Sequence, residues 1–182
     1  MNVGDKVVFG DYSTVGYIVK IEIDPIEELE VNFEKNNYTE VCLNGDEILN
    51  KAKKKRKADI ALMMAESWYH QGDYSKSIEY YKIVNENSNR KLPREVEFKI
   101  AFCMMKTNDF EGAIDHFAKV TDSDDELGQY GSYYMAQCYT NTGQDKFARN
   151  TFYKAYKMNL NDSISENALM NYAILSFIPG ID

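Results

Sequence analysis

The sequence contains few of the residues that build catalytic and metal sites. Among 182 residues there are three cysteines, two histidines, three prolines and one tryptophan. Cys42, Cys103 and Cys138 form no C-x-x-C pair, and their odd number argues against both a disulfide framework and a structural zinc site. A reducing compartment fits this cysteine usage best, so we expect a cytoplasmic protein.

Long apolar runs are also missing. None reaches the roughly 18 residues that a membrane-spanning helix requires. The first residues, MNVGDKVVFGDYSTVGY, carry charges and glycines where a signal peptide needs an unbroken apolar core. We therefore expect a soluble intracellular protein with no membrane contact.

Positive charge is scarce overall but concentrated in one place. The chain has 21 Lys plus Arg against 29 Asp plus Glu, so its formal charge is 21 − 29 = −8, which is too acidic for a dedicated nucleic-acid binder. Residues 1–50 contribute 3 − 11 = −8, residues 51–57 (KAKKKRK) contribute +6, and residues 58–182 contribute 12 − 18 = −6. The basic run marks a boundary between two regions of the chain.

The basic run has two readings. It is a nucleic-acid, anionic or targeting patch, or it is a solvated linker or helix lead-in to the region that follows. We favour the second reading because eleven carboxylates precede the run. We expect the acidic N-terminal region to dock on the rest of the chain through these cations.

Residues 1–50 contain short runs of β-branched and aromatic residues separated by Gly, Asp, Pro and Asn, which is typical of strands. The four candidate strands are KVVF, VGYIVKIEI, ELEVNF and YTEVCL. Apolar and polar residues alternate within ELEVNF, and Asn36 and Asn37 suit a tight hairpin because Asn tolerates positive φ. We expect a small antiparallel β-barrel here.

From about residue 58 onward, helical periodicity replaces the strand pattern and an internal repeat emerges. A small residue recurs at intervals of 36, 35 and 37 residues, and a residue that ends a helix or turns the chain follows it seven positions later. The small residues are Ala65, Ala101, Ala136 and Ala173, and the turn residues are Gly72, Asn108, Gly143 and Gly180. After each of the first three turns, one face of the following helix carries a small, an aromatic and a small aliphatic residue in the same spacing. These residues are Ser77, Tyr81 and Val84; Ala113, Phe117 and Val120; and Ala148, Phe152 and Ala155.

This spacing resembles the tetratricopeptide repeat (TPR) over roughly residues 58–180, with units near 58–92, 93–127, 128–164 and a partial one at 165–182. The first unit, AESWYHQGDYSKSIEYYKIV, matches the family's order of small and aromatic residues around a glycine turn. In the third unit Asp145 replaces the aromatic after the turn. The N-terminal pattern VGDKVVF…GYIVKIEI is similar to small Tudor-like or SH3-like barrels. The expected fold class is α+β and mainly α: a barrel followed by a helical solenoid of about three and a half repeats.

No constellation of catalytic residues is legible. His70 and His116 are isolated in the sequence. The acidic residues of TDSDDE (residues 121–126) lack the glycine and the distal glutamate of a calcium loop, which favours a solvated inter-helix loop. Cys103 and Cys138 occupy equivalent repeat positions, which indicates packing residues. We therefore expect a non-enzymatic protein with no catalytic residues, no cofactor and no metal.

The TPR resemblance implies that first helices line a concave groove that binds an extended peptide or a helix of a protein partner. The groove positions in this sequence would be Leu62, Glu66, Tyr69, His70, Phe98, Phe102, Met105, Lys106, Tyr130, Tyr133, Gln137, Asn141, Met170, Ile174 and Phe177. Some members of the family bind a C-terminal carboxylate with Lys, Asn and Arg at such groove positions. This sequence has Leu62, Glu66 and Phe98 there, which disfavours a receptor for chaperone tails. The aromatic groove favours an apolar or amphipathic helix as ligand, although some of these aromatics pack between repeats in the alternative reading.

The last unit is incomplete, because the sequence stops where its second helix would start. Its first helix leaves little polar surface, so we expect a partner, a second copy of the chain or missing residues to cover it. The leading functional hypothesis is a protein-binding adaptor or scaffold. The alternatives are a nucleic-acid or transcription-associated factor that uses the barrel and the basic run, and a scaffold that forms a homodimer through the last helix.

Overall fold

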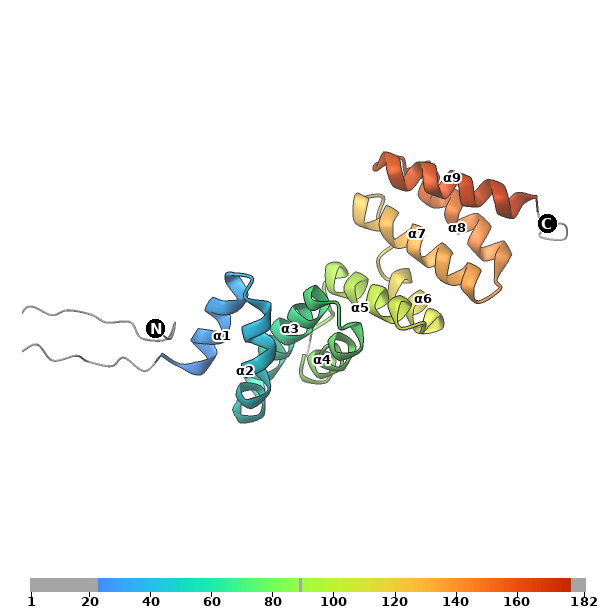
Figure 1. The fold of residues 1–182 in the computed structure, drawn as a ribbon. Coiled ribbons are helices and arrows are strands. Elements are labelled where there is room, and N and C mark those ends of the chain that lie inside the picture. The colour runs from blue at the N-terminus through green and yellow to red at the C-terminus, as the bar shows by residue number, and fades with distance from the viewer. Residues whose placement is uncertain (1–22, 89, 178–182) are drawn as a thin grey trace, which may run out of the picture.

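The computed structural model describes residues 23–88 and 90–177, and these residues form α-helices and turns with no strand among them (Figure 1). The helices of this part of the chain are α1 (Pro25–Glu34), α2 (Tyr38–Lys51), α3 (Lys54–Gln71), α4 (Tyr74–Asn87), α5 (Arg94–Lys106), α6 (Phe110–Ala118), α7 (Glu126–Asn141), α8 (Asp145–Met158) and α9 (Asp162–Ser176).

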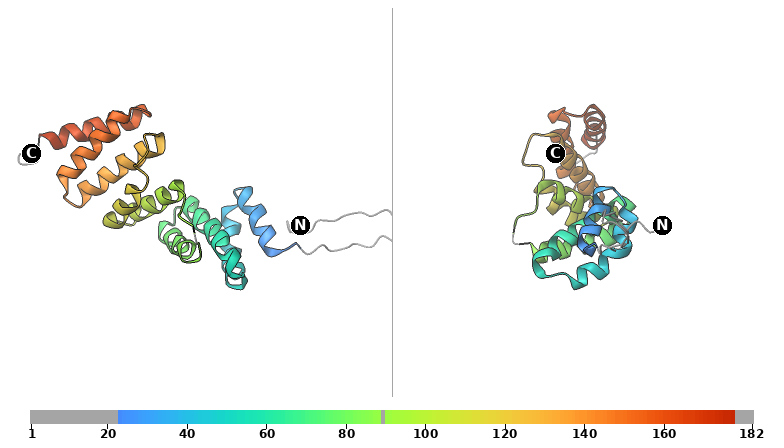
Figure 2. Two further views of the ribbon diagram at one scale, coloured as in Figure 1. Left: turned by 180° about the vertical axis from the view of Figure 1, so that it is seen from behind. Right: turned by 90° about the vertical axis from the view of Figure 1, so that its left-hand side faces the viewer.

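The helices form consecutive pairs that stack into an elongated, curved solenoid (Figures 1 and 2). The pairs are α1/α2, α3/α4, α5/α6 and α7/α8, and α9 packs on α8 at the C-terminal end. Each helix packs mainly against its neighbours in the chain, and the first helices of adjacent pairs also touch, as α1 does with α3 and α7 with α9. The molecule is therefore held together by local contacts, as in other repeat proteins.

The turn inside each pair contains one residue with positive φ. These residues are Asn36 (59°), Gly72 (78°), Asn108 (64°) and Gly143 (70°). Glycine and asparagine are the residues that adopt this left-handed conformation most readily, so each one can end its first helix and reverse the chain. The turns predicted at residues 72, 108 and 143 are thus confirmed.

The predicted α+β fold class is wrong for the described residues. ELEVNF lies in α1 and YTEVCL lies in α2, so neither segment is a strand. KVVF lies outside the described residues, and so does VGYIVKIEI except for Ile23. Asn36 does adopt positive φ, but it joins two helices and not two strands. The Tudor-like or SH3-like barrel is therefore not supported.

The local sequence explains why α1 is a helix. Asp24 caps its N-terminus, with the carboxylate accepting a hydrogen bond from the Ile26 N–H at 2.8 Å, and Pro25 occupies the first turn. Leu29 is buried, Phe33 is half-buried, and Val31 is 43% exposed, so the apolar side chains follow helical spacing. Capping chemistry and a Pro at the first position outweigh the alternation in ELEVNF.

The α1/α2 pair is an additional repeat unit. Tyr38 and Val41 of α2 stand 36 residues before Tyr74 and Ser77 of α4, in the same positions relative to the turn. Gly45 stands where α4 has the buried Tyr81. A Cβ on Gly45 would lie 1.7 Å from the Met64 Sδ, so the Met64 side chain from α3 fills the space that an aromatic ring fills elsewhere.

Small residues let the two helices of each pair approach closely. Ala65, Ala101 and Ala136 are fully buried, and the Ser77 hydroxyl donates a hydrogen bond to the Ala65 carbonyl at 2.8 Å. Cys103 and Cys138 are also fully buried, which confirms their prediction as packing residues. Burial raises the pKa of the Cys103 thiol to about 11 and that of the Cys138 thiol to about 12.

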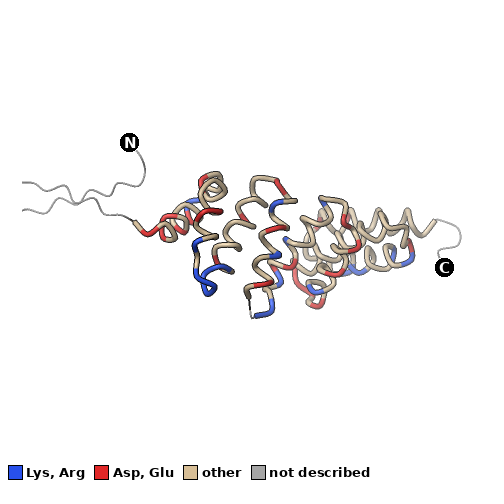
Figure 3. Tube along the Cα trace, turned by 90° about the horizontal axis from the view of Figure 1, so that it is seen from below, with Lys and Arg blue, Asp and Glu red and all other residues tan. Residues whose placement is uncertain are grey.

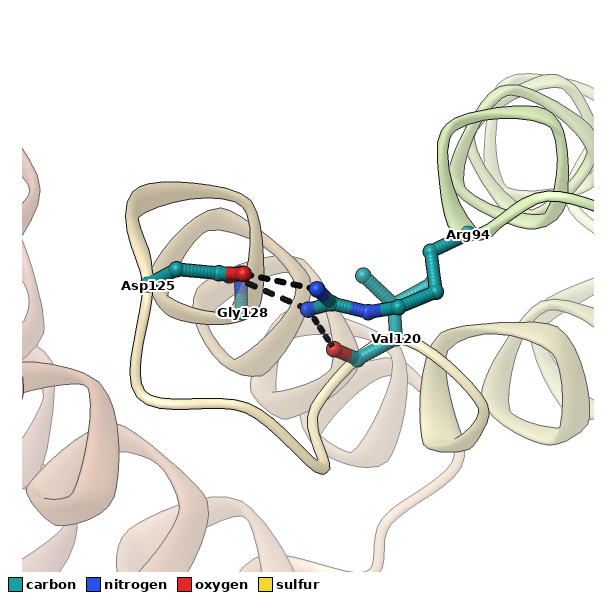
Figure 4. Close-up of polar contacts among 4 residues, drawn as sticks. All are labelled: Arg94, Val120, Asp125 and Gly128. Carbon is teal, nitrogen blue, oxygen red and sulfur yellow. Dashed lines mark hydrogen bonds and ion pairs between the residues drawn. The ribbon is translucent and has the colours of Figure 1, made fainter.

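An ion pair fixes the loop between α6 and α7 (Figure 4). The Arg94 guanidinium donates to the two Asp125 carboxylate oxygens at 2.6 and 3.0 Å and to the Val120 carbonyl at 2.6 Å. Asp125 also caps α7 by accepting from the Gly128 N–H at 2.8 Å. The Arg94 hydrogen bond and this backbone contact lower the Asp125 pKa to about 2. The acidic segment that we predicted as a solvated loop therefore includes one anchored carboxylate.

The basic run lies at the turn between α2 and α3, where Figure 3 shows its blue segments gathered. Lys51 pairs with Glu47 within α2 at 2.5 Å, and Arg56 pairs with Glu30 of α1. Residues 54–57 form the first turn of α3. One cation of the run thus ties α3 to the acidic helix α1.

Candidate functional site

Aromatic rings from three successive first helices form a continuous row, which we call the aromatic ladder. Its members are Tyr69 of α3, Phe98 and Phe102 of α5, and Tyr133 and Tyr134 of α7. The ring centroids are 6.0 Å apart for Tyr69 and Phe102, 5.4 Å for Phe102 and Tyr134, and 5.5 Å for Tyr133 and Tyr134. These spacings are those of favourable edge-to-face and tilted ring pairs, so the ladder connects three repeats.

Each ring of the ladder is half-buried. Phe98 lies against the buried Phe117 of α6 with the centroids 5.6 Å apart, and Tyr133 lies against the buried Phe152 of α8 at 5.7 Å. Burial is also the main reason that the pKa of Tyr69 and that of Tyr134 are raised. The rings are therefore anchored on one side by the core and retain exposed surface on the other.

The row continues toward the N-terminus through His70. The His70 ring lies 5.6 Å from the Tyr69 ring and stacks on Tyr38 of α2 at 4.3 Å, and Tyr38 in turn contacts Phe33 of α1 at 6.0 Å. His70 is exposed. Ring contacts thus run without a break from α1 to α8.

One ion pair and one cation–π contact lie beside the ladder. Lys99 of α5 donates to the Glu66 carboxylate of α3 at 2.7 Å, and the two side chains are 27% and 19% exposed. The Lys106 ammonium lies 5.1 Å from the Phe102 ring centroid. Glu66, which the sequence predicted as a groove residue, is therefore neutralised by Lys99 from the next repeat.

The structure brings five of the predicted groove residues into this ladder and its edges: Tyr69, Phe98, Phe102, Tyr133 and Glu66. Two more, His70 and Lys106, contact it directly.

The remaining predicted residues on α3, α5 and α7 lie around the ladder with different roles. Leu62 packs against two core clusters, one that joins α1/α2 to α3/α4 and one that joins α3/α4 to α5, and Met105 packs against the core that includes Phe117. The Tyr130 hydroxyl accepts a hydrogen bond from the Asn161 side chain at 3.2 Å, which ties it to the start of α9. Asn141 donates to the carbonyl of Gln137, one turn earlier in α7, at 2.8 Å.

The three predicted residues on α9 form a separate surface. Met170 is 55% exposed, Ile174 is 56% exposed and Phe177 is 84% exposed. Within the part of the chain that the structure describes, no ring contact links Phe177 to the ladder.

Two participants were not identified from the sequence. Tyr134 contacts Phe98 and Phe102 of the preceding first helix, and Lys99 reaches back to Glu66. Both residues lie on the side of their helix that faces the previous repeat. A search for pairs between consecutive first helices at the same height could have found Lys99, which follows Glu66 by 33 residues.

A second polar cluster joins the two helices of the third pair, α5 and α6. Glu97 of α5 is 5% exposed and bonds to the Nδ1 of His116 in α6 at 2.6 Å and to the ammonium of Lys119, which caps the C-terminus of α6, at 3.1 Å. His116 is therefore a partner of a buried carboxylate, which the sequence did not indicate. In residues 23–88 and 90–177 no group of three His, Cys, Asp or Glu side chains is placed to hold a metal ion, and none of the helices is long and apolar enough to cross a membrane.

Comparisons with known proteins agree with the repeat architecture. A model of the tetratricopeptide repeat family matches residues 95–125, which include α5 from Glu95 onward, α6 and the loop that follows. No curated protein sequence matches the chain at a significant level.

Several solved structures share the fold. MamA from Desulfovibrio magneticus RS-1 (residues 41 to its end) is 12% identical, with 84% of this chain and 91% of that chain covered and a TM-score of 0.59. BtubC (BKLC) from P. vanneervenii is 12% identical over 82% of this chain and 71% of that chain, with a TM-score of 0.58. A kinesin light chain-like protein of Podosopora anserina with nearly identical TPR-like repeats is 11% identical over 83% and 82% of the two chains, with a TM-score of 0.58. The chain therefore has a TPR-like helical repeat fold.

Proposed function

We propose that this TPR-like solenoid is an adaptor that acts by binding a protein partner along the aromatic ladder, and not by catalysis. The observation that carries the proposal is the row of half-buried rings that crosses α3, α5 and α7. Rings held on one side by the core lose little freedom on binding, and large aromatic side chains supply much of the binding energy at protein interfaces.

The ligand is an apolar or amphipathic helix, or an extended peptide, that presents uncharged side chains to the rings. Glu66 is already paired with Lys99, so a basic ligand side chain has to compete with an existing ion pair at 2.7 Å. Exposed Lys106 beside Phe102 places a cation next to the middle ring of the ladder, which favours an acidic residue at the matching position of the ligand. We propose that the predicted groove residues Leu62, Met105, Gln137 and Asn141 border the same binding surface.

Affinity capture from a lysate of the native host tests the proposal. The bait is the full chain, compared with a Phe102→Glu/Tyr133→Glu double variant that introduces two carboxylates among the rings. The control is Leu43→Glu on α2, where the leucine is 71% exposed and lies outside the ladder. Circular dichroism first establishes that the three proteins are equally helical.

We expect one partner to be retained by the wild type and the Leu43→Glu control and lost by the double variant. A peptide scan of that partner then identifies the bound segment, and its affinity for Phe102→Ala is expected to fall about 10-fold to 30-fold, since a hot-spot side chain contributes about 2 kcal/mol. Equal capture by all three proteins would refute the ladder as the binding surface.

A further inference from the structure

The exposed apolar side chains of the described residues concentrate at the C-terminal end of the solenoid. Leu169, Met170, Ile174 and Phe177 of α9 and its end are 41%, 55%, 56% and 84% exposed. Such a patch on one helix indicates an interaction surface. Leu169, Met170, Ala173 and Phe177 share one side of α9, which we call the α9 face.

The earlier repeats show what normally covers this face. Leu169 corresponds to Ala61, Glu97 and Ser132, which are at most 5% exposed. Ala173 corresponds to Ala65, Ala101 and Ala136, which are fully buried, whereas Ala173 itself is only half-buried. In α5 the equivalent positions touch α6, since Glu97 bonds to His116 and Ala101 packs with Ala113. The α9 face is therefore shaped for a helix that runs antiparallel to α9.

We propose that a second copy of this chain covers the α9 face, with the two α9 helices antiparallel across a two-fold axis near Ala173. A two-fold axis perpendicular to a helix pairs it with an antiparallel copy, which is the relation between the two helices of every repeat. Ala173 would meet its own copy, and Leu169 would meet Phe177 of the second copy. The pair of alanines reproduces the small-residue contact of Ala101 with Ala113.

The charges of α9 favour this occupant. Residues 167–177 carry no charge, so the self-pairing brings no like charges together at its centre. The nearest carboxylate, Glu166, is seven residues from Ala173. At 1.5 Å per residue the two copies of Glu166 are about 21 Å apart along the helices, which exceeds the Debye length of about 8 Å at physiological salt.

The other open end of the described solenoid is a poorer match. A pocket of about 390 Å³ between α1 and α2 has an apolar floor of Pro25, Ile26, Ile48 and Ala52. Its rim carries the carboxylates of Asp24, Glu28 and Glu47 and one cation, Lys51. The start of α9 also carries two carboxylates, Asp162 and Glu166, so head-to-tail stacking would bring together two ends that both carry excess negative charge.

Light scattering on the purified full chain tests the proposal. We expect a dimer of 2 × 21.0 = 42.0 kDa at tens of micromolar. Leu169→Glu places a carboxylate from each copy in the interface and is expected to weaken dimerisation about 100-fold or more. Leu43→Glu on α2 is the matched control and should stay dimeric. A monomeric wild type, or a Leu169→Glu variant that dimerises as well as the wild type, would overturn the proposal.

Cysteine crosslinking locates the axis. Ala173→Cys should form a disulfide-linked dimer under mild oxidation, because residues on a two-fold axis lie close to their own copies. Leu43→Cys is the control and should not crosslink, and the native Cys42, Cys103 and Cys138 are all buried. A dimer in which Ala173→Cys fails to crosslink would refute the antiparallel pairing, whatever surface holds the dimer together. Leu169→Glu leaves the aromatic ladder intact, so its failure to dimerise is distinguishable from loss of partner binding.

Discussion

In the α1/α2 pair, the Met64 side chain fills the space beside Gly45 that an aromatic ring fills in the other repeats. This packing predicts how substitutions at the two positions change the free energy of unfolding. A methyl group on Gly45 would overlap the Met64 Sδ, whose side chain is fully buried. Forcing extra volume into a packed core costs about 1–3 kcal/mol, and the better helix propensity of Ala returns about 0.5–1 kcal/mol. Gly45→Ala should therefore destabilise the wild type by about 0.5–2 kcal/mol.

The same substitution should have the opposite sign once the methionine is removed. Met64→Ala alone leaves a cavity and should cost about 2–5 kcal/mol. In that background the three atoms nearest to the Gly45 Cβ position, all from the Met64 side chain beyond its Cβ, are gone, so Gly45→Ala should stabilise the protein by about 0.5–1 kcal/mol. The resulting coupling free energy between the two sites is about 1–3 kcal/mol.

Urea unfolding measures this cycle. Trp68, the single tryptophan, lies on α3 one turn from Met64 and reports this repeat by fluorescence, while circular dichroism reports all helices. Reading the two signals separately matters because repeat arrays can unfold in more than one step. The control background is Met63→Ala, since Met63 is half-buried and is not among the nearest atoms to a Cβ on Gly45. If Gly45→Ala has the same effect with and without Met64, the proposed packing is wrong.

Three further predictions concern other parts of the solenoid. Because the Asp125 pKa is lowered to about 2, its pair with Arg94 contributes stability that is present above about pH 4 and is lost as the pH falls toward 2. Between about pH 4 and pH 2 the Asp125→Asn variant should therefore lose less of its free energy of unfolding than the wild type does, which acid titration measures. Burial raises the pKa of Cys103 to about 11 and that of Cys138 to about 12, so a thiol reagent at pH 8 should modify them only at the rate of unfolding. Mass spectrometry at increasing urea concentrations measures this rate, and fast labelling without urea would contradict the prediction. The buried Gln129 side chain donates to the Ala155 carbonyl at 3.0 Å and accepts from the backbone N–H at the start of α9. Gln129→Ala should therefore lower the free energy of unfolding by about 1–3 kcal/mol and speed amide hydrogen exchange more in α9 than in α3. Unchanged exchange in α9 would contradict this prediction.

The repeats were predictable because they recur. Three turns spaced 36 and 35 residues apart located the helix pairs from α3 to α8, and all three turns adopt positive φ. The same step taken backward from Gly72 reaches Asn36, followed by Tyr38 and Val41. The sequence of this segment also fits strands, because short apolar runs are compatible with both periodicities and because Gly45 stands at the position where the other repeats have an aromatic residue.

The candidate site was only partly predictable for a geometric reason. The periodicity of one helix assigns its residues to faces, which sufficed to place Tyr69, Phe98 and Phe102 on a common surface. It does not show which side chain reaches across from the next helix. Tyr134 and Lys99 do so, and they convert a set of separate groove positions into a connected row with a neutralised carboxylate.

The local stacking of the helix pairs also has a mechanical consequence. Since each described helix packs mainly on its neighbours, the pairs behave as springs connected in series, and a small rotation at each junction adds to the next. The total bend is then the sum over the junctions, and the stiffest junction contributes least to it. The Arg94 and Asp125 clasp spans the junction between α5/α6 and α7, so it stiffens the middle of the spring. Pulled from its two ends, the solenoid should lengthen by opening outer pairs first and keep its central rings together longest.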